Sequence, residues 1–432
     1  MYKSLNKLIM NKYLLVLTFL LAISISCKRN TGLPYKHRDV VSISVTNPLD
    51  IPQIDALVEI NVKNLVKNIK RGPVDSFVVV YDTLYPFQLN DEDKDGKSDR
   101  LLFVCSLEPG EKRMFYFIKP GEYKDHEFEK RTQAEISVKT GGAWQDNKYA
   151  GGAFENTECL RVPPGHTDHS GYIRYEGPGW ESDKVGYRFY LDWRNAIDIF
   201  GKIVDTMVLQ NVGQDGFDSY HEPAPWGMDI LKVGNSLGLG SLGIWHDERA
   251  SRVAVTDSII CEIIQNGPVQ SAIRTKYFGW QAGSIKTDLT SVLSIHAGSR
   301  ITRHQVRTSR ELQNICTGIV KHDLAEKIEA GSIAGKWTYF ATWGTQSLAD
   351  DNLGMAIFYR QDDLIRLAED DESHVIVLRP ANNELQYYFA AVWENEKKGI
   401  KNINEFKRYL ESTVSMLDNP LLIEYVKGKG IK

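Results

Sequence analysis

The sequence predicts an all-β protein, with a small N-terminal β-sandwich followed by a large curved β-sandwich domain and one C-terminal helix. Short segments of alternating apolar and polar residues recur along the chain, separated by Gly, Pro and Asn. One clear helical pattern follows Asn402. Hydrophobic residues make up 42% of the 432 residues, which is enough for a substantial core.

The N-terminus has the pattern of a targeting segment. Met10 opens a short basic stretch, residues 13–23 are apolar, and residues 24–26 lead into Cys27. The apolar run is too short to span a bilayer, so we expect a signal peptide over 1–27 and a tether over 28–38. The site resembles a bacterial lipoprotein cleavage site. Cys27 would then carry the lipid and anchor the chain to the bacterial outer membrane, on the periplasmic or the surface side. The alternative is that Cys27 is an ordinary residue near a standard cleavage site.

The N-terminal sandwich is expected over residues 39–130. Strand patterns occupy 40–48, 56–65 and 76–82, and residues 101–120 suggest a hairpin that turns at Glu108–Glu111.

The large domain is expected over residues 131–432. Two long hairpins are predicted at 252–280 and 289–308, and four further strand patterns follow. Asn402, with Glu405 three residues later, has the pattern of a helix N-cap.

Charge and cysteine content exclude several classes. The net charge of −4 gives the whole chain no electrostatic footprint for nucleic acid. Cys105, Cys159, Cys261 and Cys316 have no metal-binding spacing. We expect buried thiols, with room for one disulfide.

The segment Asp91–Asp99 predicts a structural Ca²⁺ site. Asp91, Asp93, Asp95 and Asp99 offer oxygen donors around Gly96, although the Glu that closes an EF-hand loop is missing. The alternative is a solvated acidic turn. No organic cofactor is expected.

The segment 172–202 is dense in Arg, Tyr, Trp and acidic residues. In a strand over 185–192, Val185, Tyr187, Phe189 and Leu191 would face the core. The opposite face would carry Arg188, Tyr190 and Asp192. The preceding stretch is expected to be a strand with Tyr172, Arg174 and Glu176 on one face. If the two strands pair, their polar faces would form one continuous surface that could bind a ligand. The alternative is an ordinary outer face of a sheet, which needs no ligand.

A proline-rich loop at 220–234 supplies further acid and base candidates, namely His221, Asp229 and Lys232. A loop histidine bonded to a neighbouring carbonyl is the alternative for His221. His166–His169 (HTDH) suggests a metal pair but has no third ligand at a defined spacing, so we expect a loop there.

Several motifs identify a family resemblance. They are Tyr175–Lys184, Tyr190–Asp192, Arg194–Asn195, Asp198–Lys202, Trp226–Asp229 and Lys232–Gly234. The chain resembles an uncharacterised, domain-of-unknown-function family of Bacteroidota lipoproteins. That resemblance implies a part in polysaccharide utilisation, often of uronic-acid glycans. The large β region also resembles the galactose-mutarotase-like β-supersandwich of sugar epimerases and many polysaccharide lyases.

We therefore expect a carbohydrate-active lipoprotein acting on an acidic poly- or oligosaccharide, most simply by β-elimination. Such a reaction needs a neutralised carboxylate, a base and an acid. Arg188 or Arg194 would neutralise, His221 or Lys232 would be the base, and Tyr190 the acid. Asp229 is a further catalytic candidate. The expected substrate-binding residues are Arg174, Glu176, Trp180, Glu181, Asp192, Arg194 and Trp226.

Two alternatives remain open at this stage. A hydrolase or epimerase would use paired carboxylates in the same cleft. A non-catalytic glycan-binding lipoprotein would stack sugar rings on Trp180, Trp193, Trp226 and Trp245.

Overall fold

The computed structural model describes residues 41–68, 77–92, 94–118, 126–215, 219–331 and 335–426. All of these belong to one compact unit. Cys27, the signal segment and the tether lie outside the described residues, as does Asp93. No helix in the described ranges is both long and apolar enough to cross a membrane.

The described chain is built mostly from antiparallel sheets, which confirms the all-β class, and it has one long helix near its C-terminal end. The helix α3 (Ile403–Asp418) begins as predicted, because the Asn402 side chain accepts a hydrogen bond from the backbone N–H of Glu405. A second, short helix, α2 (Val62–Asn68), was not predicted and occupies part of an expected strand.

Two sheets form the N-terminal sandwich. The first has the order β3 (Val78–Val80), β6 (Lys112–Ile118), β1 (Val41–Thr46) and β30 (Leu422–Val426). The second has the order β2 (Gln53–Asn61), β5 (Arg100–Leu107) and β4 (Gln88–Asn90). Aromatic rings fill the space between them, and those of Phe103 and Phe115 lie 4.6 Å apart.

The predicted hairpin over 101–120 is wrong in its pairing. β5 and β6 lie in different sheets, so the turn at Glu108–Glu111 connects the two layers of the sandwich. The turn itself forms, with the Glu111 N–H donating to the Glu108 carbonyl and Gly110 at φ 65°.

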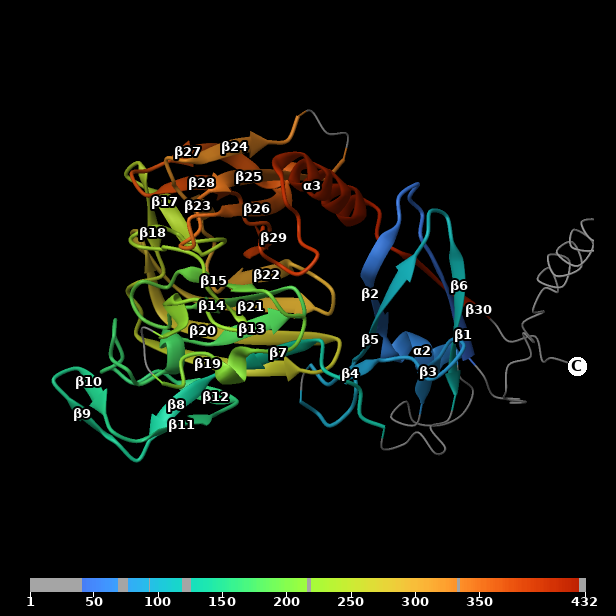
Figure 1. The fold of residues 1–432 in the computed structure, drawn as a ribbon, viewed down its shortest axis with the longest axis horizontal. Helices are drawn as coiled ribbons and strands as arrows, with labels where there is room; N and C mark the ends of the chain where they lie inside the picture. Colours follow the sequence, from blue (N-terminus) through green and yellow to red (C-terminus); the bar gives the residue numbers. More distant parts are fainter. Residues whose placement is uncertain are drawn as a thin grey trace, which may run out of the picture. The chain divides into compact units, whose positions relative to one another are not determined.

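The large domain contains a nine-stranded sheet. In Figure 1 its labels climb from β19 near the bottom to β24 at the top. Both predicted hairpins are present in it, as the pairs β19–β20 and β21–β22. The order is β12 (Cys159–Arg161), β19 (Ser258–Asn266), β20 (Gln270–Ala282), β21 (Ile285–His296), β22 (Ile301–Thr308), β29 (Glu384–Trp393), β26 (Asn352–Arg360), β25 (Trp337–Thr345) and β24 (Ala325–Glu329).

Two five-stranded sheets accompany it. The first, which positions the candidate site, has the order β16 (Gly227–Asp229), β15 (Ile197–Lys202), β14 (Val185–Phe189), β13 (Gly179–Ser182) and β7 (Thr132–Glu135). The second has the order β18 (Arg249–Arg252), β17 (Gly243–His246), β23 (Ile315–Val320), β28 (Ser373–Leu378) and β27 (Leu364–Glu369).

The remaining elements are small. Two hairpins are formed by β8 (Ser137–Thr140) with β11 (Ala153–Asn156), and by β9 (Ala143–Gln145) with β10 (Lys148–Ala150). Single 3₁₀ turns occur at Arg174–Glu176, Leu209–Asn211, Ser219–His221 and Gln361–Asp363.

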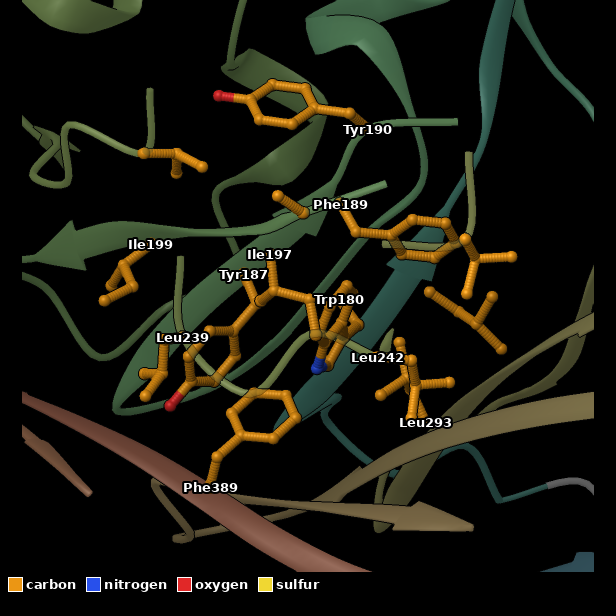
Figure 2. Packing of buried hydrophobic residues seen from close by; sticks show 14 of the residues in the cluster. Trp180, Tyr187, Phe189, Tyr190, Ile197, Ile199, Leu239, Leu242, Leu293 and Phe389 are labelled. Atoms are coloured by element: carbon orange, nitrogen blue, oxygen red, sulfur yellow. The ribbon is translucent and has the colours of Figure 1, made fainter. Parts of the chain in front are cut away.

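One large apolar core joins the nine-stranded sheet to the sheet of β13–β16. Trp180 stacks on Tyr187, and the Tyr187 ring meets Phe389 edge-on at 5.4 Å (Figure 2). Cys105, Cys261 and Cys316 are buried free thiols as expected, whereas Cys159 is exposed, and no disulfide joins any of the four.

Candidate functional site

The site lies on the face of β14–β16 opposite that core. Tyr187 and Phe189 point into the core, so the alternation of a strand turns Arg188 to the other face. The register places Arg188 directly opposite Asp198, and Phe200 opposite Asp229. Three motifs distant in sequence thus bring their charged groups together.

We call Arg188, Tyr190, Asp198, Tyr220, His221 and Asp229 the polar network. Arg188 Nη2 lies 2.7 Å from Oδ2 of Asp198 and 2.7 Å from Oδ2 of Asp229. Its Nη1 donates to the Tyr220 hydroxyl at 2.8 Å, and the Tyr190 hydroxyl donates to Asp198 at 2.7 Å. All of these groups except His221 are buried, because Phe200, Val208, Leu209 and Val212 pack beside them.

His221 is where this network reaches solvent. It lies in the 3₁₀ turn Ser219–His221, its side chain is 33% exposed, and its Nε2 lies 3.3 Å from Oδ2 of Asp229. The hydrogen bond to Asp229 raises the pKa of His221. A partly exposed imidazole backed by a buried carboxylate is a group that can exchange a proton with a bound molecule.

Two buried groups of the network hold protons strongly. Burial and the neighbouring Asp229 raise the pKa of Asp198 to about 7, against the opposing effect of Arg188. Burial raises the pKa of Tyr190 well above its usual range. Paired groups with shifted protonation are typical of acid–base sites, although structural networks also show them.

A second cluster surrounds Arg194. Its guanidinium binds Asp192 at 2.5 Å, Asp168 at 2.6 Å and Glu176 at 2.8 Å. The guanidinium also lies over the Tyr190 ring at 4.0 Å. The ring of Tyr190 therefore connects this cluster to the polar network.

An exposed aromatic surface lies beside this cluster. Trp193 is 48% exposed, and the Arg252 guanidinium lies 5.6 Å from its ring. Arg252 donates to the Ser236 carbonyl but forms no ion pair within the described part of the chain. Burial lowers the pKa of Arg252, and nearby Arg194 lowers it further while Asp192 opposes this.

The structure brings Arg188, Tyr190, His221 and Asp229 together but leaves out Lys232. Lys232 is exposed and forms no hydrogen bond or ion pair in the described ranges. Asp192 and Glu176 belong to the Arg194 cluster, and Trp226 is partly buried edge-on against Phe200.

Three expected ligand-binding residues have internal partners instead. Trp180 is fully buried and donates to Thr302 Oγ1 at 2.9 Å, so it cannot stack on a sugar. Glu181 is fully buried and forms an ion pair with Lys202. It also accepts hydrogen bonds from the backbone N–H groups of Val208 and Leu209. Arg174 is buried against Glu135. Trp245, from the binding alternative, is also buried.

The expected strand before residue 177 is wrong. Arg174–Glu176 form a 3₁₀ turn in which Tyr175 and Glu176 have φ of 40° and 69°. β14 pairs with β13, which forms inside the segment expected to be a loop, and on its other side with β15. The polar face is also covered rather than open, since Arg188 is 1% exposed.

The Asp91–Asp99 segment forms a compact turn. Asp91 accepts from the backbone N–H groups of Asp95 and Gly96, and Asp99 accepts from that of Glu92. Asp93 lies outside the described residues, so Ca²⁺ binding there stays a prediction.

Sequence reasoning missed Asp198, Tyr220 and Arg252 as site residues. Asp198 had a usable signal, because a carboxylate between Ile197 and Ile199 in a strand must point away from the core. Tyr220 is positioned by a 3₁₀ turn and Arg252 by the strand order of its sheet, and no short motif encodes either.

A cavity of about 550 Å³ lies elsewhere. Glu59, His296, Arg300, Arg303 and Tyr388 are among the residues lining it. No residue of the polar network lines this cavity, so the two features are separate.

Comparison with known proteins places this arrangement in a family. The family model described as "Domain of unknown function (DUF4861)" matches residues 45–423. The chain belongs to this family. The match includes the N-terminal sandwich and the large domain, and every residue of the polar network. The expected domain-of-unknown-function family is therefore confirmed, while the lipid anchor and the link to polysaccharide utilisation stay predictions.

One curated relative in the comparison is "Uncharacterized protein P7" of Formosa agariphila (strain DSM 15362 / KCTC 12365 / LMG 23005 / KMM 3901 / M-2Alg 35-1). It is 23% identical over 441 residues, which cover 95% of this chain and 98% of the relative.

Two solved structures from Enterococcus faecalis are similar at a low level. The first, an alpha-mannosidase from strain V583, has a TM-score of 0.47 at 10% identity, covering 91% of this chain and 46% of the enzyme. The second, a protein in glycosyl hydrolase family 38, has a TM-score of 0.44 at 9% identity, covering 91% and 48%. The chain therefore corresponds to less than half of either protein.

Proposed function

We propose that this protein is a carbohydrate-active enzyme that acts on uronic-acid-containing glycans by β-elimination, with His221 as the general base. The observation that carries the proposal is the partly exposed His221 imidazole hydrogen-bonded to the buried Asp229 carboxylate. Asp229 would orient the imidazole and stabilise its protonated form. The acidic-glycan substrate is supported by the family resemblance of the sequence, by a half-buried guanidinium without an ion pair and by an exposed indole, which are described next.

Arg252 and Trp193 are the proposed substrate-binding groups. A guanidinium without an ion pair suits the carboxylate of a uronate, and an exposed indole suits a sugar ring. Arg188 is excluded from this role, because it is buried and already held by Asp198 and Asp229. It acts instead by fixing Asp229 behind His221.

The proposed reaction assigns one step to each group. His221 removes the proton at C5, and the released electron pair forms the C4–C5 double bond as the bond to the leaving oxygen breaks. The leaving oxygen takes a proton from water, because the expected acid Tyr190 is buried and its hydroxyl already donates to Asp198. The paired-carboxylate alternative is disfavoured, since Asp198 and Asp229 are each 1% exposed and share one guanidinium nitrogen.

The test is an assay for unsaturated products on pectic, alginate-type and glycosaminoglycan substrates. His221→Ala should lower the rate by about 10²–10⁴-fold, as expected for loss of a general base. His246→Ala is the matched control, because His246 is an exposed histidine on β17. Absence of product from the wild type across the panel would overturn the proposal.

Trp193 favours one second candidate, a glycan-binding protein without turnover. Calorimetric titration with the same glycans separates the two functions. Binding that persists without product, and that Trp193→Ala weakens, would favour the second candidate.

A further inference from the structure

The cavity of about 550 Å³ lies on the outer face of the nine-stranded sheet. Tyr387 and Phe389 belong to the large core, so the alternation of β29 turns Tyr388 to the opposite face. The register places Arg303 of β22 directly opposite Tyr388, and Ser294 of β21 directly opposite Arg303. These three residues line the cavity together with residues of β2 and α3. Ligand sites typically have volumes of about 300–1,000 Å³ and often lie where parts of a protein meet.

Arg303 gives the cavity a guanidinium that its internal partner holds loosely. Its nitrogens lie 3.4 and 3.5 Å from the carboxylate oxygens of Glu59, which is longer than the roughly 2.7–2.9 Å usual for such pairs. Arg300 also lines the cavity, but Glu396 binds its guanidinium at 2.7 and 2.6 Å. Arg303 can therefore bind a further carboxylate, whereas Arg300 is already engaged.

The acidic residues of the lining do not cancel the positive charge. Asp55 accepts hydrogen bonds at 3.2 and 2.7 Å from the guanidinium of Arg131, which lies outside the lining. Glu59 is the partner of Arg303. Lys184 lines the cavity, is half-buried and forms no ion pair within the described chain. The cavity thus has a surplus of positive charge, which favours an anionic ligand.

Polar side chains around the cavity lack hydrogen-bond partners in the part of the chain that the structure describes. Gln270 is 4% exposed, and its side-chain amide forms no hydrogen bond there. The hydroxyl of Thr413, on α3, is buried and also has no partner. Both residues line the cavity. Unsatisfied buried polar groups are costly, and the hydroxyl groups of a ligand would satisfy them.

We propose that this cavity binds one small hydroxylated carboxylate, such as a cyclic sugar acid or an open-chain hydroxy acid. The carboxylate would bind Arg303, with Lys184 adding positive charge, and a hydroxyl group would bond to the Gln270 amide. Leu57 and Met416 also line the cavity and suit the apolar face of such a molecule. An apolar acid would leave Gln270 unsatisfied, and a neutral sugar would leave the guanidinium without a carboxylate.

The site goes beyond the proposed function and does not rest on it. No residue of the polar network lines this cavity, and a single sugar acid has no glycosidic bond to cleave. Binding can therefore be measured without turnover. A protein that binds a sugar acid here but produces no unsaturated sugar would leave this inference intact and overturn the proposed function.

The test is calorimetric titration of the full chain with D-glucuronate and with D-gluconate, and we expect one binding site per chain. The cyclic and the open-chain acid distinguish the two sources of this chemistry. D-glucose lacks the carboxylate and should bind at least about tenfold more weakly than the better acid, as expected for loss of a charged hydrogen-bond partner. Cyclohexanecarboxylate lacks the hydroxyl groups and should also bind more weakly. Failure of both acids to bind would overturn the proposal.

Two variants test the assigned residues. Arg303→Gln should weaken binding of the better acid by about 10–100-fold. Gln270→Met should weaken it by about three- to tenfold without lowering the melting temperature, because the amide has no partner to lose in the free protein. A purely structural role for Gln270 would instead lower the melting temperature and leave the affinity unchanged, which would contradict its assignment.

The matched control is Arg307→Gln. Arg307 lies on the same strand and face as Arg303, but its side chain is 74% exposed and it does not line the cavity. This variant should keep the affinity of the wild type. Binding that survives Arg303→Gln but is lost in Trp193→Ala would belong to the proposed substrate site, and that result overturns the assignment to this cavity.

Discussion

Burial separates the roles of arginines that look alike in sequence. Arg188 is 1% exposed and fully engaged by Asp198, Asp229 and Tyr220, so its charge organises the interior. Arg252 is half-buried and forms no ion pair in the described ranges, so its charge is available to a ligand. The surrounding carboxylates, and not the residue type, decide which arginine can meet an anionic substrate.

The contribution of His221 to stability should depend on pH. Its pKa is raised in the folded state by Asp229, so the stabilisation is fully present below the unfolded pKa of about 6.5 and is lost as pH rises through the folded pKa. The melting temperature of the wild type should exceed that of His221→Ala most at about pH 6 and least at about pH 9. A difference independent of pH would show that Asp229 does not hold the protonated form.

Lys202 and Glu181 form a fully buried ion pair, with Lys202 Nζ 2.5 Å from Glu181 Oε2. Removing Lys202 leaves the Glu181 carboxyl buried without its cationic partner. We expect Lys202→Met to lower the free energy of unfolding by about 3–5 kcal/mol in urea titrations. The double variant Lys202→Met, Glu181→Leu should lose less than the single one, and equal losses would contradict this account.

At the scale of elements, local pattern predicted strands better than their partners. The hairpins β19–β20 and β21–β22 and the cap of α3 were predictable, because their decisive contacts lie within a few residues. The turn at Glu108–Glu111 was also predicted correctly. The sequence of a turn does not show whether the two strands that it joins pair in one sheet or belong to the two layers of a sandwich. β30 gave no short-range signal, since its partner is β1.

β30 should be needed for the stability of the N-terminal sandwich. It pairs with β1 from Ser42–Val426 to Thr46–Leu422, and Ile423 and Tyr425 pack against the sandwich core. A chain ending at Pro420 should melt at a lower temperature and aggregate more, because β1 becomes an open edge. A chain ending at Val426 is the control, and equal melting of both chains would contradict the role of β30.

The candidate site was also predictable only in part. Arg188, Tyr190, His221 and Asp229 were selected from residue type, and the structure gathers them. Strand alternation indicated which side chains share a face, but not that the segment containing Leu209 and Val212 covers that face. Trp180 and Glu181 were misplaced for this reason, since their burial depends on strands more than 100 residues away or on that covering segment.

At the scale of the whole molecule, buried histidines should make the fold sensitive to acid. Burial lowers the pKa of His304 to about 3 and also lowers the pKa of His166, His296 and His374. The unfolded chain binds more protons on these residues below about pH 6.5, so the free energy of unfolding should fall as pH falls. Groups whose pKa is raised in the folded state, Asp198 among them, oppose this trend.

The urea midpoint should therefore fall between about pH 7 and pH 5. His304→Gln should reduce that fall by removing one of these histidines, and Gln retains a polar group near Ser291, the present partner of His304. His322→Gln, at an exposed histidine, is the control. The same fall in His304→Gln and the wild type would contradict this account.

The pairing of β1 with β30 also sets an order of events during synthesis. Ser44 and Glu424, which share a hydrogen bond, are 380 residues apart in the chain. β1, the first strand of the described chain, must therefore wait for β30, while the hairpins of the large domain can close as soon as they are synthesised. Until then β1 and its apolar residues stay without their edge partner, so the first of the described strands to be made is among the last to be completed.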